Sequence, residues 1–322
     1  MIFNRDLCET LRKAGLLLAI FLSLCVPRFA YSIQTDTILE TARKLIGGEN
    51  LVGASTLLES YIKEAPPSAE AHFLLGYVLF RQKLAKESLA QFTAGAQIKS
   101  PSVTELKIIA ADYILLGDFN DADKWLTNVV NSSPHDPDAW YLLGRTKYNE
   151  NHFDEAIESF NHTLSLRPRD VKAENNLGIS YEGLNRVEEA QSAFQTAISW
   201  QENSSIQDAQ PFLNLGSLLL RDGQAAGAIT WLSKAVQAAP DNAKAREQLS
   251  QAYITENNLL QAQHELEIAV KLAPNASALH YKLGQLYHRL GKTTDSQREF
   301  DLCARLLSTN SSIDIPNPPS TQ

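Results

Sequence analysis

The sequence predicts an all-α solenoid, a linear stack of helix–turn–helix units, and three observations support this fold class. Five Leu-Gly dipeptides, which begin at Leu75, Leu143, Leu177, Leu215 and Leu283, follow one another at intervals of 68, 34, 38 and 68 residues, which is a period of 34 with one shift of four. A second apolar anchor, Phe or Leu, follows about seventeen residues after each Leu-Gly. Five prolines mark the ends of units, where a residue without an N–H stops a helix. Such self-similarity is typical of proteins whose units stack on their neighbours.

The first 32 residues follow other rules. Three basic residues precede an uncharged run of 13 residues, Ala14 to Val26, and small residues at Ala30 and Ser32 are spaced as a signal peptidase requires. We expect residues 1–32 to be a secretory signal peptide, which would place the mature protein in the periplasm or the secreted space. The uncharged run is shorter than the about 18 residues that span a bilayer, but an uncleaved leader acting as a membrane anchor is the alternative.

Eight repeats are expected between residues 35 and 310. In five of the eight units the first helix carries the Leu-Gly pair, and in all eight the second helix carries the apolar anchor with a small residue four positions before it. Gly lowers helix propensity by about 1 kcal/mol, so its recurrence indicates close packing against the facing helix. The units begin near Thr35, Ala69, Val103, Pro137, Val171, Ala209, Ala243 and Ser277.

These residues resemble the tetratricopeptide repeat. The fourth unit matches the family's pattern of W, LG, A, F and P through Trp140, Leu143, Gly144, Ala156, Phe160 and Pro168. Lys147 departs from the pattern, which has Tyr there. The resemblance implies a right-handed superhelical solenoid in which the first helix of each repeat lines a concave groove.

Two segments depart from the regular array. The polar sequence from Gln201 to Ser205 takes up the four extra residues between the fifth and sixth repeats, so we expect an insertion in a loop. Pro211 follows in the first turn of the next helix, where proline is tolerated. Residues 311–322 contain too few apolar side chains to pack and are predicted to be a disordered tail.

Composition and motifs argue against catalysis and against nucleic-acid binding. The net charge is −8, and it becomes about −10 without the leader, whereas nucleic acid and anionic membranes require clustered basic side chains. The seven histidines are spread over five repeats without metal-ligand spacing, and no phosphate-binding loop occurs. Only Cys303 remains once the leader is removed. The sequence therefore predicts no catalytic residues, no metal site and no cofactor.

The resemblance also implies which residues face the groove, namely those just before and just after each Leu-Gly pair. Asn176 and Asn214 match positions of the inward Asn ladder in the tetratricopeptide superhelix of O-GlcNAc transferases, where such amides hold the backbone of an extended peptide. An amide suits this role because it offers an acceptor and two donors. The alternative is that these amides are simply solvated. The predicted groove residues are Tyr141, Arg145, Lys172, Asn176, Asn214, Gln248 and Lys282.

The predicted function is that of a non-enzymatic scaffold or adaptor of the cell envelope or secreted space, which holds a peptide or a partner protein in its groove. Two alternatives stay open. One is a membrane-tethered assembly factor that keeps its leader as an anchor, and the other is an accessory subunit of an enzyme. The partner's identity and the oligomeric state do not follow from these patterns, since a fold does not imply one ligand.

Overall fold

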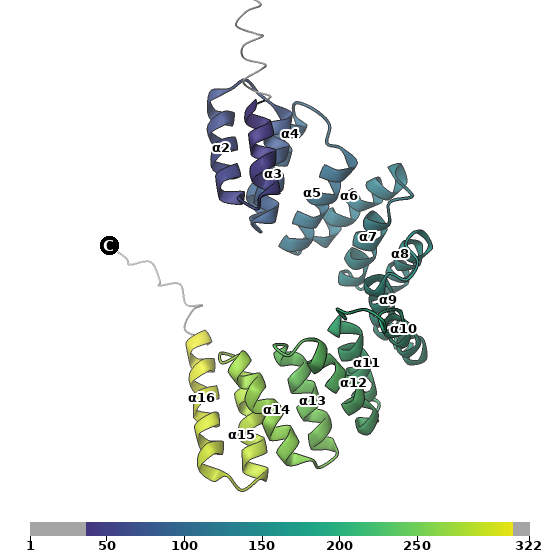
Figure 1. Cartoon of the computed structure of the whole chain (residues 1–322), viewed down its shortest axis with the longest axis vertical. Coiled ribbons are helices and arrows are strands. Elements are labelled where there is room, and N and C mark those ends of the chain that lie inside the picture. The colour runs from purple at the N-terminus through teal and green to yellow at the C-terminus, as the bar shows by residue number, and fades with distance from the viewer. Residues whose placement is uncertain (1–36, 312–322) are drawn as a thin grey trace, which may run out of the picture. The chain divides into compact units, whose positions relative to one another are not determined.

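The computed structural model describes residues 37–311, so the predicted signal peptide and all but the first residue of the predicted tail lie outside the described residues. Every regular element in this range is an α-helix (Figure 1). A first helical segment covers residues 37–47. It is followed by α2 (Leu51–Glu64), α3 (Ala69–Arg81), α4 (Ala85–Ala96), α5 (Val103–Leu116), α6 (Phe119–Ser132), α7 (Pro137–Asn149), α8 (Phe153–Leu166), α9 (Val171–Gly183), α10 (Val187–Trp200), α11 (Ala209–Arg221), α12 (Ala225–Ala238), α13 (Ala243–Thr255), α14 (Leu259–Leu272), α15 (Ser277–Arg289) and α16 (Thr293–Ser311).

The starts of the first helices are set by polar capping residues. The side chains of Ser68, Ser102, Asp170, Asp208 and Asn242 each accept a hydrogen bond from a backbone N–H in the first turn of the helix that follows. Such a cap satisfies a donor that has no partner within the helix, and its loss typically costs about 1 kcal/mol.

The turns between paired helices share one backbone conformation. Each contains a residue in the left-handed region with φ between 58° and 77°, and these residues follow one another at the repeat period: Glu49, Lys83, Gly117, Asn151, Asn185, Gly223, Asn257 and Gly291. Gly and Asn enter this region at lower cost than other residues, and they occupy six of these eight positions. The same turn is therefore built at each repeat from compatible residues.

The Leu-Gly pair and the apolar anchor form a single contact between the two helices of a repeat. A Cβ atom on Gly178 would lie 2.5 Å from Cε1 of Phe194, and one on Gly216 would lie 2.6 Å from Cγ of Leu232. Both distances are too short for non-bonded carbon atoms. The structure thus confirms that glycine is present because the facing side chain occupies the space of a Cβ.

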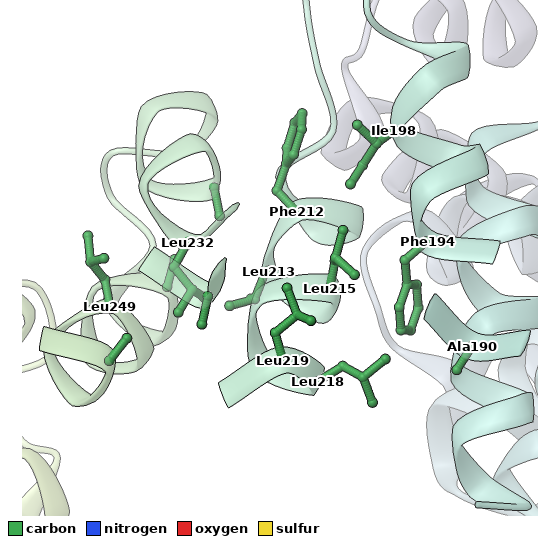
Figure 2. Close-up of a cluster of buried hydrophobic side chains, with 14 residues drawn as sticks. Ala190, Phe194, Ile198, Phe212, Leu213, Leu215, Leu218, Leu219, Leu232 and Leu249 are labelled. Carbon is green, nitrogen blue, oxygen red and sulfur yellow. The ribbon is translucent and has the colours of Figure 1, made fainter. Parts of the chain in front are cut away.

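The chain divides into two compact units, with the boundary between Thr146 and Lys147 inside α7. In the C-terminal unit the largest apolar cluster runs through α10, α11, α12 and α13, and it includes Phe194, Leu215 and Leu249 (Figure 2). In the N-terminal unit one cluster joins residues 37–47, α2 and α3, and another joins α5, α6 and α7. Each core therefore continues from one repeat into the next.

The insertion between α10 and α11 is built around a buried amide. Gln201 is buried, and its Nε2 donates to the carbonyl oxygen of Asp208 at 2.9 Å, while the backbone N–H of Asp208 donates to Oε1 of Gln201 at 2.7 Å. The side chain of Gln201, at the start of the predicted loop, thus closes the loop by two hydrogen bonds to the backbone of Asp208 at its end.

The core of the N-terminal unit contains one carboxyl group that lacks a hydrogen bond. Asp112, on α5, is fully buried, and neither of its carboxyl oxygens has a partner. The neighbouring Ser88 hydroxyl donates to the carbonyl oxygen of Gly76 at 2.9 Å. Burial raises the pKa of Asp112 to about 6, against a smaller opposing effect of Ser88. The same position of other repeats holds Val78, Thr146, Ser180, Leu218, Ala252 and Leu286.

Candidate peptide-binding face

The first helices of neighbouring repeats contact one another inside each unit. In the C-terminal unit α9 contacts α11 and α11 contacts α13, and in the N-terminal unit α3 contacts α5. The second helices α10, α12 and α14 make no comparable contacts with one another in the described part of the chain. Since the first helices lie closer together, they form the inner side of each unit. We call the side formed by α9, α11, α13 and α15 the inner face of the C-terminal unit.

Two predicted groove residues connect neighbouring repeats across the inner face. Asn214 of α11 donates from Nδ2 to Oδ1 of Asn175 on α9 at 2.9 Å. Lys282 of α15 pairs in the same way with Glu247 of α13. In both cases the residue just before the Leu-Gly leucine bonds to the residue two places before the corresponding leucine of the preceding repeat. These polar side chains therefore hold adjacent first helices together on the inner face.

The carboxylate of Glu247 is shared between two lysines. Its Oε2 also lies 2.9 Å from Nζ of Lys244, one turn earlier on α13. Burial alone would raise the pKa of Glu247, but the hydrogen bonds from Lys282 and Lys244 outweigh it and hold the pKa below its usual range. One negative charge thus faces two positive charges at this point of the inner face.

The amides of the inner face keep part of their hydrogen-bonding capacity. Asn176 donates from Nδ2 to the carbonyl oxygen of Lys172 in its own helix at 2.7 Å, and Oδ1 of Asn214 accepts from Gln210 at 2.8 Å. An amide has two N–H donors and two acceptor lone pairs, so Asn214 retains one donor and one lone pair after its two bonds. Gln248 is half-buried and makes no hydrogen bond with its side chain to the described residues.

The predicted site residues do not all belong to one unit. Tyr141 and Arg145 lie on the part of α7 that belongs to the N-terminal unit, where Tyr141 is half-buried and Arg145 is exposed. The other five, from Lys172 to Lys282, belong to the C-terminal unit. The structure thus brings together the lysine and amide part of the predicted set along α9, α11, α13 and α15.

Sequence reasoning missed a pocket farther along the same helices. A cavity of about 590 Å³ is lined by Gln251 and Ile254 of α13, by Phe300 of α16, and by α15 residues including Lys282, Gln285, Leu286, His288 and Arg289. Of these residues only Lys282 was predicted. Gln285 and Arg289 stand three and seven residues after Lys282 and thus share its helix face, so the sequence contained a signal for this pocket. The prediction used mainly the residue immediately before the leucine of each Leu-Gly position.

Residues 37–311 show neither a metal centre nor a membrane span. Nowhere in this range do three or more His, Cys, Asp or Glu side chains come together as metal ligands would. None of the helices in the same range is long and apolar enough to cross a bilayer.

Comparison with curated proteins finds similarity to parts of larger proteins. The chain is 22% identical over 222 residues to human Protein O-mannosyl-transferase TMTC1, which covers 66% of this chain and 25% of that protein. It is 32% identical over 103 residues to Protein FlbA of Caulobacter vibrioides, covering 32% of this chain and 17% of that protein. It is 24% identical over 193 residues to the peroxisomal targeting signal receptor of Saccharomyces cerevisiae, covering 47% of this chain and 32% of that protein. The chain thus spans a third or less of the length of these relatives.

Solved structures share the fold at low sequence identity. A tetratricopeptide repeat protein from Parabacteroides merdae aligns with a TM-score of 0.64 at 16% identity, covering 84% of this chain and 98% of that chain. A chain of the APC/C hetero-tetramer Cut9-Hcn1 aligns with a TM-score of 0.57 at 14% identity, covering 84% of this chain and 53% of that chain. At these identities the likeness concerns the fold alone.

Family models identify the repeats directly. Three models described as tetratricopeptide repeat match residues 39–102 and 176–243, residues 137–170, and residues 219–286. The matched segments contain the Leu-Gly and anchor contacts described above, and the helix pairs of the structure have the period that these models describe. Arrays of this kind serve as scaffolds for protein binding. The chain therefore belongs to the tetratricopeptide repeat family.

Proposed function

We propose that this protein is a non-enzymatic scaffold or adaptor that holds an extended segment of a partner protein along the inner face of its C-terminal unit. The observation that carries the proposal is the row of amides there with unused donors and acceptors. Asn214, Gln248, Gln251 and Gln285 stand on three successive first helices. A bound peptide backbone presents alternating N–H and C=O groups, which amides can pair with whatever the peptide's side chains are.

The inner-face residues that hydrogen-bond to one another also fit this role. Bonds such as that from Asn214 to Asn175 limit the rotamers of side chains on the inner face before any partner arrives. A preorganised face loses less conformational entropy on binding than a mobile one. We further propose that the protein acts after export, which is supported by the leader-like pattern of residues 1–32.

The test compares amides on the inner face with amides elsewhere in the same unit. Gln248→Ala with Gln251→Ala removes two inner-face amides, whereas Gln261→Ala with Gln237→Ala removes two exposed amides of α14 and α12. A partner is first recovered with the wild-type chain from its native compartment, and its affinity for each variant is then measured by calorimetry. We expect the inner-face pair to lose about 0.5 to 1.5 kcal/mol per bond and the control pair to bind as the wild type does. Equal affinity of both pairs would contradict the proposal.

A further inference from the structure

The pocket between α13 and α15 carries an excess of positive charge. Its lining includes Lys282 and Arg289, together with the titratable His288, and it contains no Asp or Glu. Arg289 is exposed and forms no ion pair with any carboxylate of residues 37–311. Lys282 is paired with Glu247, but that carboxylate also serves Lys244. In a chain of net charge −8, this pocket is a local site of uncompensated positive charge.

The floor of the same pocket is apolar. Ile254 and Phe300 are half-buried, so their side chains leave some apolar surface in the cavity, whereas the lining residue Leu286 is almost fully buried. Gln251 and Gln285 are exposed at its walls and make no hydrogen bond with their side chains to the described residues. The volume of about 590 Å³ is within the range of pockets that accept small ligands or a few side chains.

The three features together specify a ligand chemistry. A carboxylate matches the guanidinium of Arg289, with which it can form two parallel hydrogen bonds, and the ammonium of Lys282. An apolar side chain beside the carboxylate would cover the apolar surface of Ile254 and Phe300. The free amides of Gln251 and Gln285 can pair with the peptide groups between these side chains.

From this combination we propose that the pocket between α13 and α15 selects partner segments in which Asp or Glu alternates with apolar residues. This inference rests on the proposed function, because it names the chemistry of the segment that the inner face holds. The carboxylate binds Arg289, and the neighbouring apolar side chain packs against Ile254 and Phe300.

The test uses the full chain and two fluorescein-labelled peptides. The acidic peptide is Ser-Gly-Leu-Glu-Leu-Glu-Leu-Gly-Ser, and the matched peptide has Gln in place of both Glu residues. Arg289→Gln removes the unpaired charge of the pocket. Lys271→Gln is the control, since Lys271 is an exposed basic residue of α14 in the same unit that forms no ion pair with the described residues. Binding is measured by fluorescence anisotropy at low and at raised salt.

We expect the wild-type chain to bind the acidic peptide about tenfold more tightly than the amide peptide, as the loss of a charge-assisted hydrogen bond implies. Arg289→Gln removes this difference, Lys271→Gln keeps it, and raised salt reduces it. If both peptides bind the wild-type chain equally, or if Arg289→Gln changes nothing, acidic selection is wrong while peptide binding by the inner face stands. If neither peptide binds, acidic selection is again wrong, and the variants of Gln248 and Gln251 decide the proposed function separately.

Discussion

Replacing the buried carboxyl group of Asp112 by threonine should stabilise the N-terminal unit. Threonine has nearly the same volume as aspartate, and the structure shows what a hydroxyl does at this position of the repeat. Oγ1 of Thr146 donates to the carbonyl oxygen of Leu142 at 2.9 Å, and Oγ of Ser180 donates to that of Asn176 at 2.9 Å. A threonine at position 112 can bond to the carbonyl oxygen of Ile108, four residues earlier, in the same way.

The magnitude follows from the pKa of Asp112, which burial raises from 3.8 to about 6. A difference of one in pKa corresponds to about 1.4 kcal/mol, so an ionised Asp112 costs the folded state about 3 kcal/mol. Above pH 6 the carboxyl group is ionised in the folded and unfolded states alike, and the full cost is present. As the pH falls from 6 toward 3.8, the folded state takes up a proton before the unfolded state does, and the cost disappears.

Amide hydrogen exchange of α5 measures this effect directly. At pH 7, Asp112→Thr should slow exchange that occurs through opening of α5 by up to about 100-fold, and the amides of α11 in the other unit serve as the internal control. Between pH 7 and pH 5 the opening free energy of α5 should rise in the wild-type chain and stay level in the variant, after correction for the intrinsic rate. An α5 that is equally or less protected in the variant at pH 7 would refute the reasoning, as would the same pH dependence in both chains.

Three further predictions concern the core, the glycines and the leader. Phe194→Ala empties a fully buried position and should destabilise the C-terminal unit by about 3 to 5 kcal/mol, with exchange rising first in the adjacent repeats; a uniform rise over the unit would contradict this. Gly216→Ala should destabilise the C-terminal unit by about 1 to 3 kcal/mol, because the new Cβ would lie 2.6 Å from Leu232. Gly227→Ala should stabilise it by about 0.5 to 1 kcal/mol, because the nearest atom to the new Cβ is 3.6 Å away. The midpoints of urea unfolding of the two variants should therefore shift in opposite directions. The intact mass of the exported chain should correspond to a start at or near Ile33, and a mass that includes residues 1–32 would favour the membrane anchor.

The sequence was sufficient to predict the class of fold and the role of its repeated residues. Helical spacing and a period of 34 residues report which side chains are buried, because each repeat must cover the same face of its neighbour. The glycines of the Leu-Gly pairs were therefore expected to pack closely against the facing helix, and the structure shows the side chain that each one meets, such as Phe194 for Gly178. The left-handed turns follow from sequence only in part, since Gly and Asn enter this conformation at low cost but Glu49 and Lys83 adopt it as well.

Only the tertiary structure decided how the polar side chains of the inner face pair with one another. That Asn214 bonds to Asn175, and Lys282 to Glu247, depends on the rotation and axial offset of two packed helices whose bonded residues lie 39 and 35 positions apart in the chain. The period places position 112 among buried positions, but only the structure shows that both carboxyl oxygens of Asp112 lie there without a hydrogen-bond partner. The pocket between α13 and α15 likewise required the packed helices, since Gln251 and Ile254 come from the preceding repeat and Phe300 from the second helix, although the α15 residues share one stretch of sequence.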